Sequence, residues 1–139
     1  MSFSHLIVSI AFKYITPKLR LDHDSLNDTL LLSKSFHLIC SPERCVDLVV
    51  NILKRRSSLE DARAHRRPLF IWEPVPDLCV PEQLGACREA LKYVDVISPN
   101  HAELCGFFGV QPHDTHGNIG TLAALYNIEY LTKVKQRRI

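Results

Sequence analysis

The chain has 139 residues, with 17 basic and 15 acidic side chains and a formal net charge of +2. This balance argues against a nucleic-acid partner and against an anionic membrane surface, because both require a concentrated excess of positive charge. Apolar residues make up 46% of the sequence, enough for one domain with a buried core, and the five cysteines form no CxxC pair, which favours reduced thiols in a cytoplasmic protein.

Residues 1–35 form a poorly defined N-terminal segment. Strand-type residues run from Leu6 to Ile15, and a polar stretch with one expected helical turn, LDHDSLNDT, follows Pro17. The apolar run at residues 6–12 is far too short to span a bilayer and lacks the flanks of a signal peptide. We therefore expect no membrane association.

The pattern becomes regular at residues 36–40, FHLIC, a continuous apolar run typical of a buried strand. Ser41 and Pro42 follow as an N-cap and a first-turn proline. The next apolar residues recur at helical spacing and predict one buried helix face: Val46, Val49, Val50 and Leu53. Lys54, Arg55 and Arg56 close this helix and are expected in solvent.

A second strand is predicted at residues 68–72, PLFIW, and prolines 74, 76 and 81 predict an extended loop after it. A second helix follows, with Leu84, Cys87 and Leu91 on one face. Residues 94–97, VDVI, are the third strand, and a third helix begins after Asn100 and ends at Gly106 or Gly109.

Strands that alternate with helices predict an α/β fold with a mostly parallel sheet and helices on both faces, centred on residues 36–109. Residues 110–139 form a divergent tail that is expected to be helical, with a face made of Leu122, Leu125, Ile128 and Leu131. Three strands make a small sheet with open edges, which is typical of part of a larger fold.

Candidate site residues lie where the strands end, since open parallel sheets bind ligands at the carboxyl ends of their strands. Asn100 and Glu103 have the spacing of a helix-capping box, and the same pair can orient a hydrated Mg²⁺ and phosphate oxygens beside a helix N-terminus. Glu73 follows the second strand, as a solvated loop acid or as an acid that meets a polar substrate or a cation.

Other candidates are weaker. Trp72 is expected in the core more than as a stacking platform. The pairs His101/Cys105 and His113/His116 lack the paired-ligand spacing of structural zinc sites, so no zinc is expected. Nothing in the chain specifies a Cys/His nucleophile pair, and no residue is assigned as catalytic.

Three segments match those of a known family in the same order: SKSFHLICSPERC, RPLFIWEPVPDLCVPEQL and ALKYVDVISPNHAEL. They resemble the PfkB (ribokinase-like) carbohydrate kinases, and among these the fungal, maintenance-of-killer-like branch. The resemblance covers residues 33–109 well and residues 10–32 faintly. It implies a three-layer α/β/α sandwich that transfers a phosphoryl group from ATP to a sugar or nucleoside hydroxyl.

The resemblance also implies roles for three residues. Asn100 and Glu103 correspond to the family's N-x-x-E motif, which contributes to the magnesium and phosphate environment, with Glu103 acting on Mg²⁺ indirectly. Glu73, followed by Pro74, corresponds to the acid after the preceding strand. The implied cofactors are Mg²⁺ and ATP, and the implied partner is a small sugar or nucleoside.

The chain departs from the family at both ends. MSFSHLIVSIAF does not resemble the family's Gly-rich first strand and sugar-binding region. The family's late signature D-T-x-G-A-G-D supplies the anion hole and the catalytic base. Residues 114–120 read Asp-Thr-His-Gly-Asn-Ile-Gly, with glycine where the base would be, and they follow Asn100 too soon to leave room for the intervening strands, so we interpret this likeness as a coincidence. We therefore expect a truncated, catalytically incompetent kinase-like protein. The alternative is a non-catalytic accessory or remnant protein, associated with a fungal biosynthetic pathway.

Overall fold

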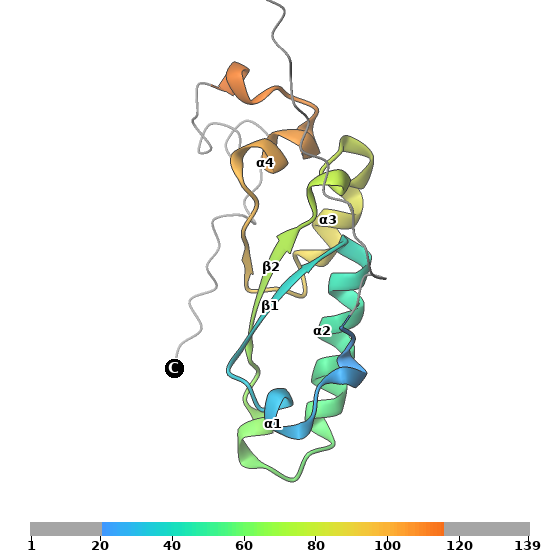
Figure 1. The fold of residues 1–139 in the computed structure, drawn as a ribbon, viewed down its shortest axis with the longest axis vertical. Helices are drawn as coiled ribbons and strands as arrows, with labels where there is room; N and C mark the ends of the chain where they lie inside the picture. Colours follow the sequence, from blue (N-terminus) through green and yellow to red (C-terminus); the bar gives the residue numbers. More distant parts are fainter. Residues whose placement is uncertain (1–20, 116–139) are drawn as a thin grey trace, which may run out of the picture.

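The structure is a computed structural model that describes residues 21–115 (Figure 1). Two sequence predictions lie outside these residues: the strand-type segment from Leu6 to Ile15 and the helix expected near Leu122 to Leu131. Within the described range the chain forms a small parallel sheet with helices, which confirms the predicted α/β class.

The sheet has three parallel strands in the order β1-β2-β3: β1 at Ser35–Cys40, β2 at Leu69–Pro74 and β3 at Val96–Ile97. β1 and β2 pair along their whole length, whereas β3 adds a single short step opposite Ile71 and Trp72. The sequence placed all three strands, but the third is half as long as expected and the second continues through Pro74.

Pro74 is tolerated inside β2 because the N–H that proline lacks would point toward a position where β3 offers no acceptor. The carbonyl oxygens of Phe70 and Trp72 accept from the backbone N–H groups of Asp95 and Ser98, so alternate residues of β2 face β3. Pro74 continues that alternation at a point where β3 has already ended. The expectation that proline excludes strand pairing here was therefore wrong.

The longest helix, α2 (Pro42–Ser57), begins where the sequence predicted, with Ser41 accepting from the Arg44 N–H at 3.3 Å. Its buried face is shifted by one residue from the predicted one, and Val50 is 45% exposed. The buried apolar side chains of the helix body are Cys45, Leu48, Val49 and Ile52.

The other α-helices of the described residues are α3 (Leu84–Ala90), α4 (His101–Phe108) and the four-residue α1 (Asp28–Leu31). Figure 1 shows α2 and α3 on the same side of the sheet, with α4 near the carboxyl end of β2. Both crossovers between successive parallel strands are right-handed by preference, which puts α2 and α3 on one face. In the described residues helices cover this face alone, so the expected second helical layer is not among them.

Trp72 lies at the centre of the core. Its side chain is fully buried, and its indole N–H donates to the Cys40 carbonyl oxygen at 3.0 Å. Next to it, Phe70 stacks on Phe36 with ring centroids 5.5 Å apart. Trp72 is therefore a core residue, as the sequence favoured.

Arg56 corrects the expectation that the basic end of α2 is solvated. The residue is 2% exposed, and its guanidinium donates to the carbonyl oxygens of four residues. These acceptors are Leu31, Ser33, Arg63 and Arg66. Arg56 thus holds α1 and the loop before β2 against the end of α2, and Arg55 adds bonds to two carbonyls of residues 23–26.

The second face of the sheet is apolar and open among residues 21–115. Ile39, Leu69 and Val96 are 62%, 44% and 40% exposed, although all three are strand residues with large apolar side chains. They alternate with the side chains that face α2 and α3. We call this surface the open sheet face; it also carries His37, Ile71 and Glu73. No helix in the described residues is long and apolar enough to cross a membrane.

Candidate functional site

The turn from β3 into α4 carries the Asn100 and Glu103 pair. Ser98 ends the strand by donating its N–H to the Trp72 carbonyl oxygen at 2.8 Å, and Pro99 follows. Asn100 takes an extended backbone conformation as the N-cap, and α4 starts at His101. Gly109, with φ of 64°, ends the helix in the left-handed conformation that glycine favours. The turn therefore lies at the carboxyl edge of the sheet, as predicted.

Asn100 and Glu103 form a complete capping box. The Asn100 Oδ1 accepts from the Glu103 N–H at 2.9 Å, and the Glu103 Oε2 accepts from the Asn100 N–H at 2.8 Å. A third bond joins the Asn100 amide Nδ2 to Glu103 Oε1 at 2.7 Å. Both carboxylate oxygens of Glu103 are thus hydrogen-bonded to one residue, and the side chain is buried.

This geometry fits an indirect role toward a magnesium ion. Mg²⁺ prefers oxygen ligands in a regular octahedron and commonly keeps several water molecules. Direct coordination by Glu103 would compete with the capping box, whereas the remaining lone pairs of its two oxygens can accept from metal-bound water. The donor set of Glu103 would therefore fit a hydrated magnesium ion held through water, and it does not fit direct coordination.

Glu73 lies within β2 and not in the loop after it. Its side chain points to the open sheet face, where Oε2 is 3.1 Å from Nε2 of His37 on β1. Both side chains are about half exposed. Glu73 is therefore a strand residue on the open sheet face, and the sequence prediction of a rigid loop acid was wrong about its setting.

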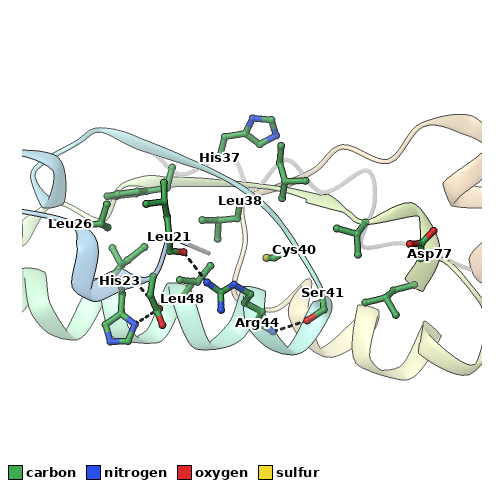
Figure 2. A pocket seen from close by; sticks show the side chains of 16 residues that line it. Leu21, His23, Leu26, His37, Leu38, Cys40, Ser41, Arg44, Leu48 and Asp77 are labelled. Atoms are coloured by element: carbon green, nitrogen blue, oxygen red, sulfur yellow. Dashed lines mark hydrogen bonds and ion pairs between the residues drawn. The ribbon is translucent and has the colours of Figure 1, made fainter. Parts of the chain in front are cut away.

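The structure also reveals a groove that the sequence did not predict. It lies beside β1 and above α2, with a volume of about 830 Å³ (Figure 2). Leu38, Cys40 and Leu48 line its interior, and Ser41 and Arg44 lie at its carboxyl-end side. A groove between a strand edge and a helix depends on tertiary packing, so no local sequence signal marks it.

Cys40 lines this groove, and its thiol could act as a nucleophile if it were ionised. A hydrogen bond from the Cys45 thiol lowers the pKa of Cys40, and the positive charge of Arg44 acts in the same direction against the effect of burial. Cys45, the donor, has a raised pKa for the same reason and because it is buried. Cys40 is only 5% exposed, so the structure describes a sheltered thiol pair.

Among the described residues, one group of side chains has the types and the spacing of metal ligands. Asp22, His23 and Asp47 are the group whose ligand atoms lie within 4.8 Å of one another. The His23 Nδ1–H donates to the Asp22 Oδ1 at 2.8 Å, which accounts for the closeness of these two residues without an ion. Of the residues that the sequence analysis considered for zinc and did not favour, Cys105 is fully buried in α4, and His116 lies outside the described residues.

Comparison with known proteins finds two curated relatives in yeasts. An uncharacterized protein of Schizosaccharomyces pombe is 32% identical over 71% of this chain and 26% of its own length. Protein MAK32 of Saccharomyces cerevisiae is 33% identical over 71% of this chain and 28% of its own length. No family model matches the chain, and no solved structure matches it.

These relatives are much longer than the region they share with this chain, which spans little more than a quarter of their length. The shared region is large enough to include most of the described α/β unit.

Proposed function

We propose that this chain is a PfkB-type, ribokinase-like carbohydrate kinase homologue that, by itself, does not catalyse phosphoryl transfer. The observation that carries the proposal is the capping box of Asn100 and Glu103 at the carboxyl end of β3, after two units in which a helix connects parallel strands. In the resembled family this position belongs to the magnesium and phosphate environment. ATP and Mg²⁺ are the proposed cofactors, and a sugar or nucleoside is the proposed substrate class.

Two further features support this proposal. The sheet leaves one apolar face open among the described residues, as expected for one part of a three-layer α/β/α sandwich. The chain also spans about a quarter of its longer relatives. The five cysteines are all free thiols, which is consistent with the proposed cytoplasmic location.

The missing activity follows from the chemistry of the transfer. Phosphoryl transfer depends on positioning and on charge stabilisation, together with a base that takes the proton of the acceptor hydroxyl. In the resembled family the base is the last residue of D-T-x-G-A-G-D, and residues 1–139 contain no segment with this complete signature. Asn100 and Glu103 can orient phosphate and a hydrated cation, but neither supplies this base.

The test separates phosphate binding from turnover. We expect Mg²⁺ with ADP to shift the backbone amide NMR signals of residues 98–103 in the full chain, and Glu103→Gln to weaken the effect about tenfold by removing one charge while keeping a hydrogen-bonding side chain. Glu89→Gln, an exposed carboxylate on α3, is the matched control and should change nothing. Unchanged signals at millimolar Mg²⁺ and ADP would contradict the kinase-like site.

Turnover is measured on the same samples. With ATP, Mg²⁺ and a panel of sugars and nucleosides, we expect no acceptor-dependent ADP release above the level of Glu103→Gln. Turnover that depends on an acceptor and disappears in Glu103→Gln would overturn the proposed incompetence.

A second function, a non-catalytic accessory protein, is favoured by the open sheet face. Exposed apolar strand residues of this size mark surfaces that another polypeptide covers.

Ile39→Thr should reduce the fluorescence of an apolar dye bound to the chain while changing the free energy of unfolding by less than about 0.5 kcal/mol. Its neighbour Leu38, which points to α2, provides the contrast: Leu38→Ala should cost about 2–5 kcal/mol. Dye binding that Ile39→Thr leaves unchanged would count against this role.

A further inference from the structure

Two thiols meet where β1 ends and α2 begins. Ser41 is the N-cap of α2, so Cys40 is the residue just before the cap and Cys45 is the fourth residue of the helix. Side chains at these two positions commonly pack against each other across the start of a helix. The Cys45 N–H donates to the Ser41 carbonyl oxygen at 2.9 Å, and the Cys45 thiol donates to the Cys40 sulfur. The local geometry of the turn thus places the two sulfur atoms in contact.

Only one member of this pair is reached from the groove. Cys40 lines the groove, and Figure 2 shows its side chain between Leu38 and Ser41. Cys45 belongs to the buried face of α2 and has no exposed surface. A small reagent that enters the groove therefore meets Cys40 first, and Cys45 becomes available to it through Cys40.

The two thiols are also prepared for different roles. The hydrogen bond from Cys45 lowers the pKa of Cys40, and the positive charge of Arg44 acts in the same direction. The start of a helix favours a thiolate as well, because its free N–H groups carry partial positive charge. The same hydrogen bond raises the pKa of Cys45, which therefore keeps its proton. Cys40 is the nucleophile of the pair, and Cys45 is the neighbour that holds a proton to give.

The other three cysteines lack this combination. Burial raises the pKa of Cys79 to about 11, and its thiol donates to the Val75 carbonyl oxygen at 3.4 Å. Burial also raises the pKa of Cys87 to about 12. Cys105 is fully buried in a separate apolar cluster on α4. A reagent that selects thiolates should therefore distinguish Cys40 from all three.

We propose that Cys40 and Cys45 form a peroxide-sensitive dithiol, in which Cys40 is oxidised from the groove and Cys45 converts the product into a disulfide within the chain. The oxidant belongs to the class of small hydroperoxides, of which hydrogen peroxide is the simplest. This site is independent of the phosphate chemistry proposed above, and it joins the carboxyl end of β1 to the first turn of α2.

The reaction has two steps. The Cys40 thiolate attacks one peroxide oxygen, so that an S–O bond forms, the O–O bond breaks and the second oxygen leaves as hydroxide. The Cys40 sulfur is thereby oxidised by two electrons to a sulfenic acid, and the peroxide is reduced. The Cys45 sulfur then attacks the Cys40 sulfur, an S–S bond forms, and the hydroxyl group leaves with the Cys45 proton as water.

The disulfide requires only a short movement. An S–S bond is about 2 Å long, so the two sulfur atoms must approach from hydrogen-bonding contact. Rotation of the two side chains can supply this approach, since each cysteine has several staggered positions around its Cα–Cβ bond. A dithiol reductant reverses the reaction by thiol–disulfide exchange.

Peptide mapping of the full chain after treatment with hydrogen peroxide tests the proposal. Trypsin cuts after Arg44 and so places the two cysteines on different peptides, residues 35–44 and residues 45–54. We expect these two peptides to be recovered as one disulfide-linked product that a dithiol reductant separates. Oxidation of Cys40 should be at least about tenfold faster than oxidation of Cys87, because only Cys40 combines thiolate character with access from the groove.

Substitutions separate the two roles. Cys45→Ser should abolish the linked product and leave the Cys40 sulfenic acid to be captured by a cyclic 1,3-diketone, whereas Cys40→Ser should abolish both products. Cys87→Ser is the matched control, since Cys87 is a buried thiol of the same core whose charge acts on Cys45. It should change the rate of linkage by less than about twofold, because Cys87 takes part in neither step. The emission of Trp72 checks that each variant is folded during the reaction.

Three results would overturn the proposal. The first is a disulfide that joins Cys45 to Cys87, or that joins two copies of the chain, in place of the expected link. The second is oxidation of Cys40 and Cys87 at equal rates in the unmodified chain. The third is a linked product that forms only when urea has shifted the Trp72 emission to that of the unfolded chain, since the proposed reaction takes place in the folded protein.

Discussion

Asn100 and Glu103 are joined by three hydrogen bonds, so substitution of either residue should lower the stability of the fold. Asn100→Ala removes the acceptor for the Glu103 N–H and the amide donor to the Glu103 carboxylate. We expect a loss of about 1 kcal/mol in the free energy of unfolding, measured by urea denaturation. Asn100→Ser keeps an N-cap acceptor and should stay within a few tenths of a kcal/mol. An equal loss in both variants would show that the cap contributes little.

Arg56 is the residue whose removal should be most costly among the charged side chains of α2. Arg56→Ala leaves its four carbonyl acceptors in a buried setting without their charged donor, which predicts a loss of about 3 kcal/mol or more. Lys54→Ala, an exposed cation in the same helix turn, should change stability by less than about 0.5 kcal/mol. Similar thermal midpoints for the two variants would contradict the internal role of Arg56.

For single residues, the sequence predicted hydrogen bonds between close neighbours in the chain well, and bonds between residues far apart in the chain poorly. The two partners of the capping box are only three residues apart, so their spacing alone predicted the bonds. The bonds of Arg56 reach carbonyls up to 25 residues away, and nothing in Lys-Arg-Arg distinguishes the buried cation from the exposed one. The same holds for Glu73 and His37, which meet only because two parallel strands set their register.

Among the helices, α4 depends on a close approach to the loop before α3. A Cβ atom on Gly106 would lie 2.1 Å from the Cys79 carbonyl oxygen, a backbone atom that cannot move aside alone. Gly106→Ala should therefore destabilise the fold by about 2 kcal/mol or more, despite the higher helix propensity of alanine.

Gly85 in α3 provides the matched control, since a Cβ there would meet nothing within 4 Å. Gly85→Ala should raise the free energy of unfolding by up to about 1 kcal/mol through helix propensity alone. Both changes are measured by chemical denaturation. Stabilisation in both variants would mean that α4 is not held against the loop at Cys79.

Element positions were predicted from capping and periodicity, but buried faces were not. Ser41-Pro42 and Asn100 mark helix starts because caps act locally. The face of α2 was misjudged by one residue, since Val46 and Val50 fit a helical spacing as well as Cys45 and Leu48 do. Only the sheet, by presenting Phe70 and Trp72 to one side of α2, decides between the two.

For the molecule as a whole, the buried thiols predict a loss of stability at alkaline pH. Burial raises the pKa of Cys79 to about 11, with the negative charge of Glu103 adding to it, and burial raises the pKa of Cys87 to about 12. A thiol whose pKa is higher in the folded state than in the unfolded state stabilises the fold fully below the unfolded pKa, near 9.

The stability should therefore fall progressively from about pH 9 as the unfolded thiols ionise, and through pH 11–12 as the folded ones do. Urea midpoints between pH 8 and pH 10.5 measure this loss. The double variant Cys79→Ala and Cys87→Ala, although less stable at pH 8, should show a shallower decline. A decline of the same slope in both proteins would assign it to other groups.

Trp72 is the single tryptophan of the chain, and its position gives the molecule an internal optical reporter. The indole is fully buried between β1 and the helical layer and is bonded to the Cys40 backbone, so its emission reports on the strand pair at the centre of the sheet. Folding of this unit can thus be followed without an attached dye, by the shift of the emission to longer wavelength as water reaches the ring. Because the ring lies far from either end of the sequence, this signal separates loss of the central sheet from events confined to the terminal segments.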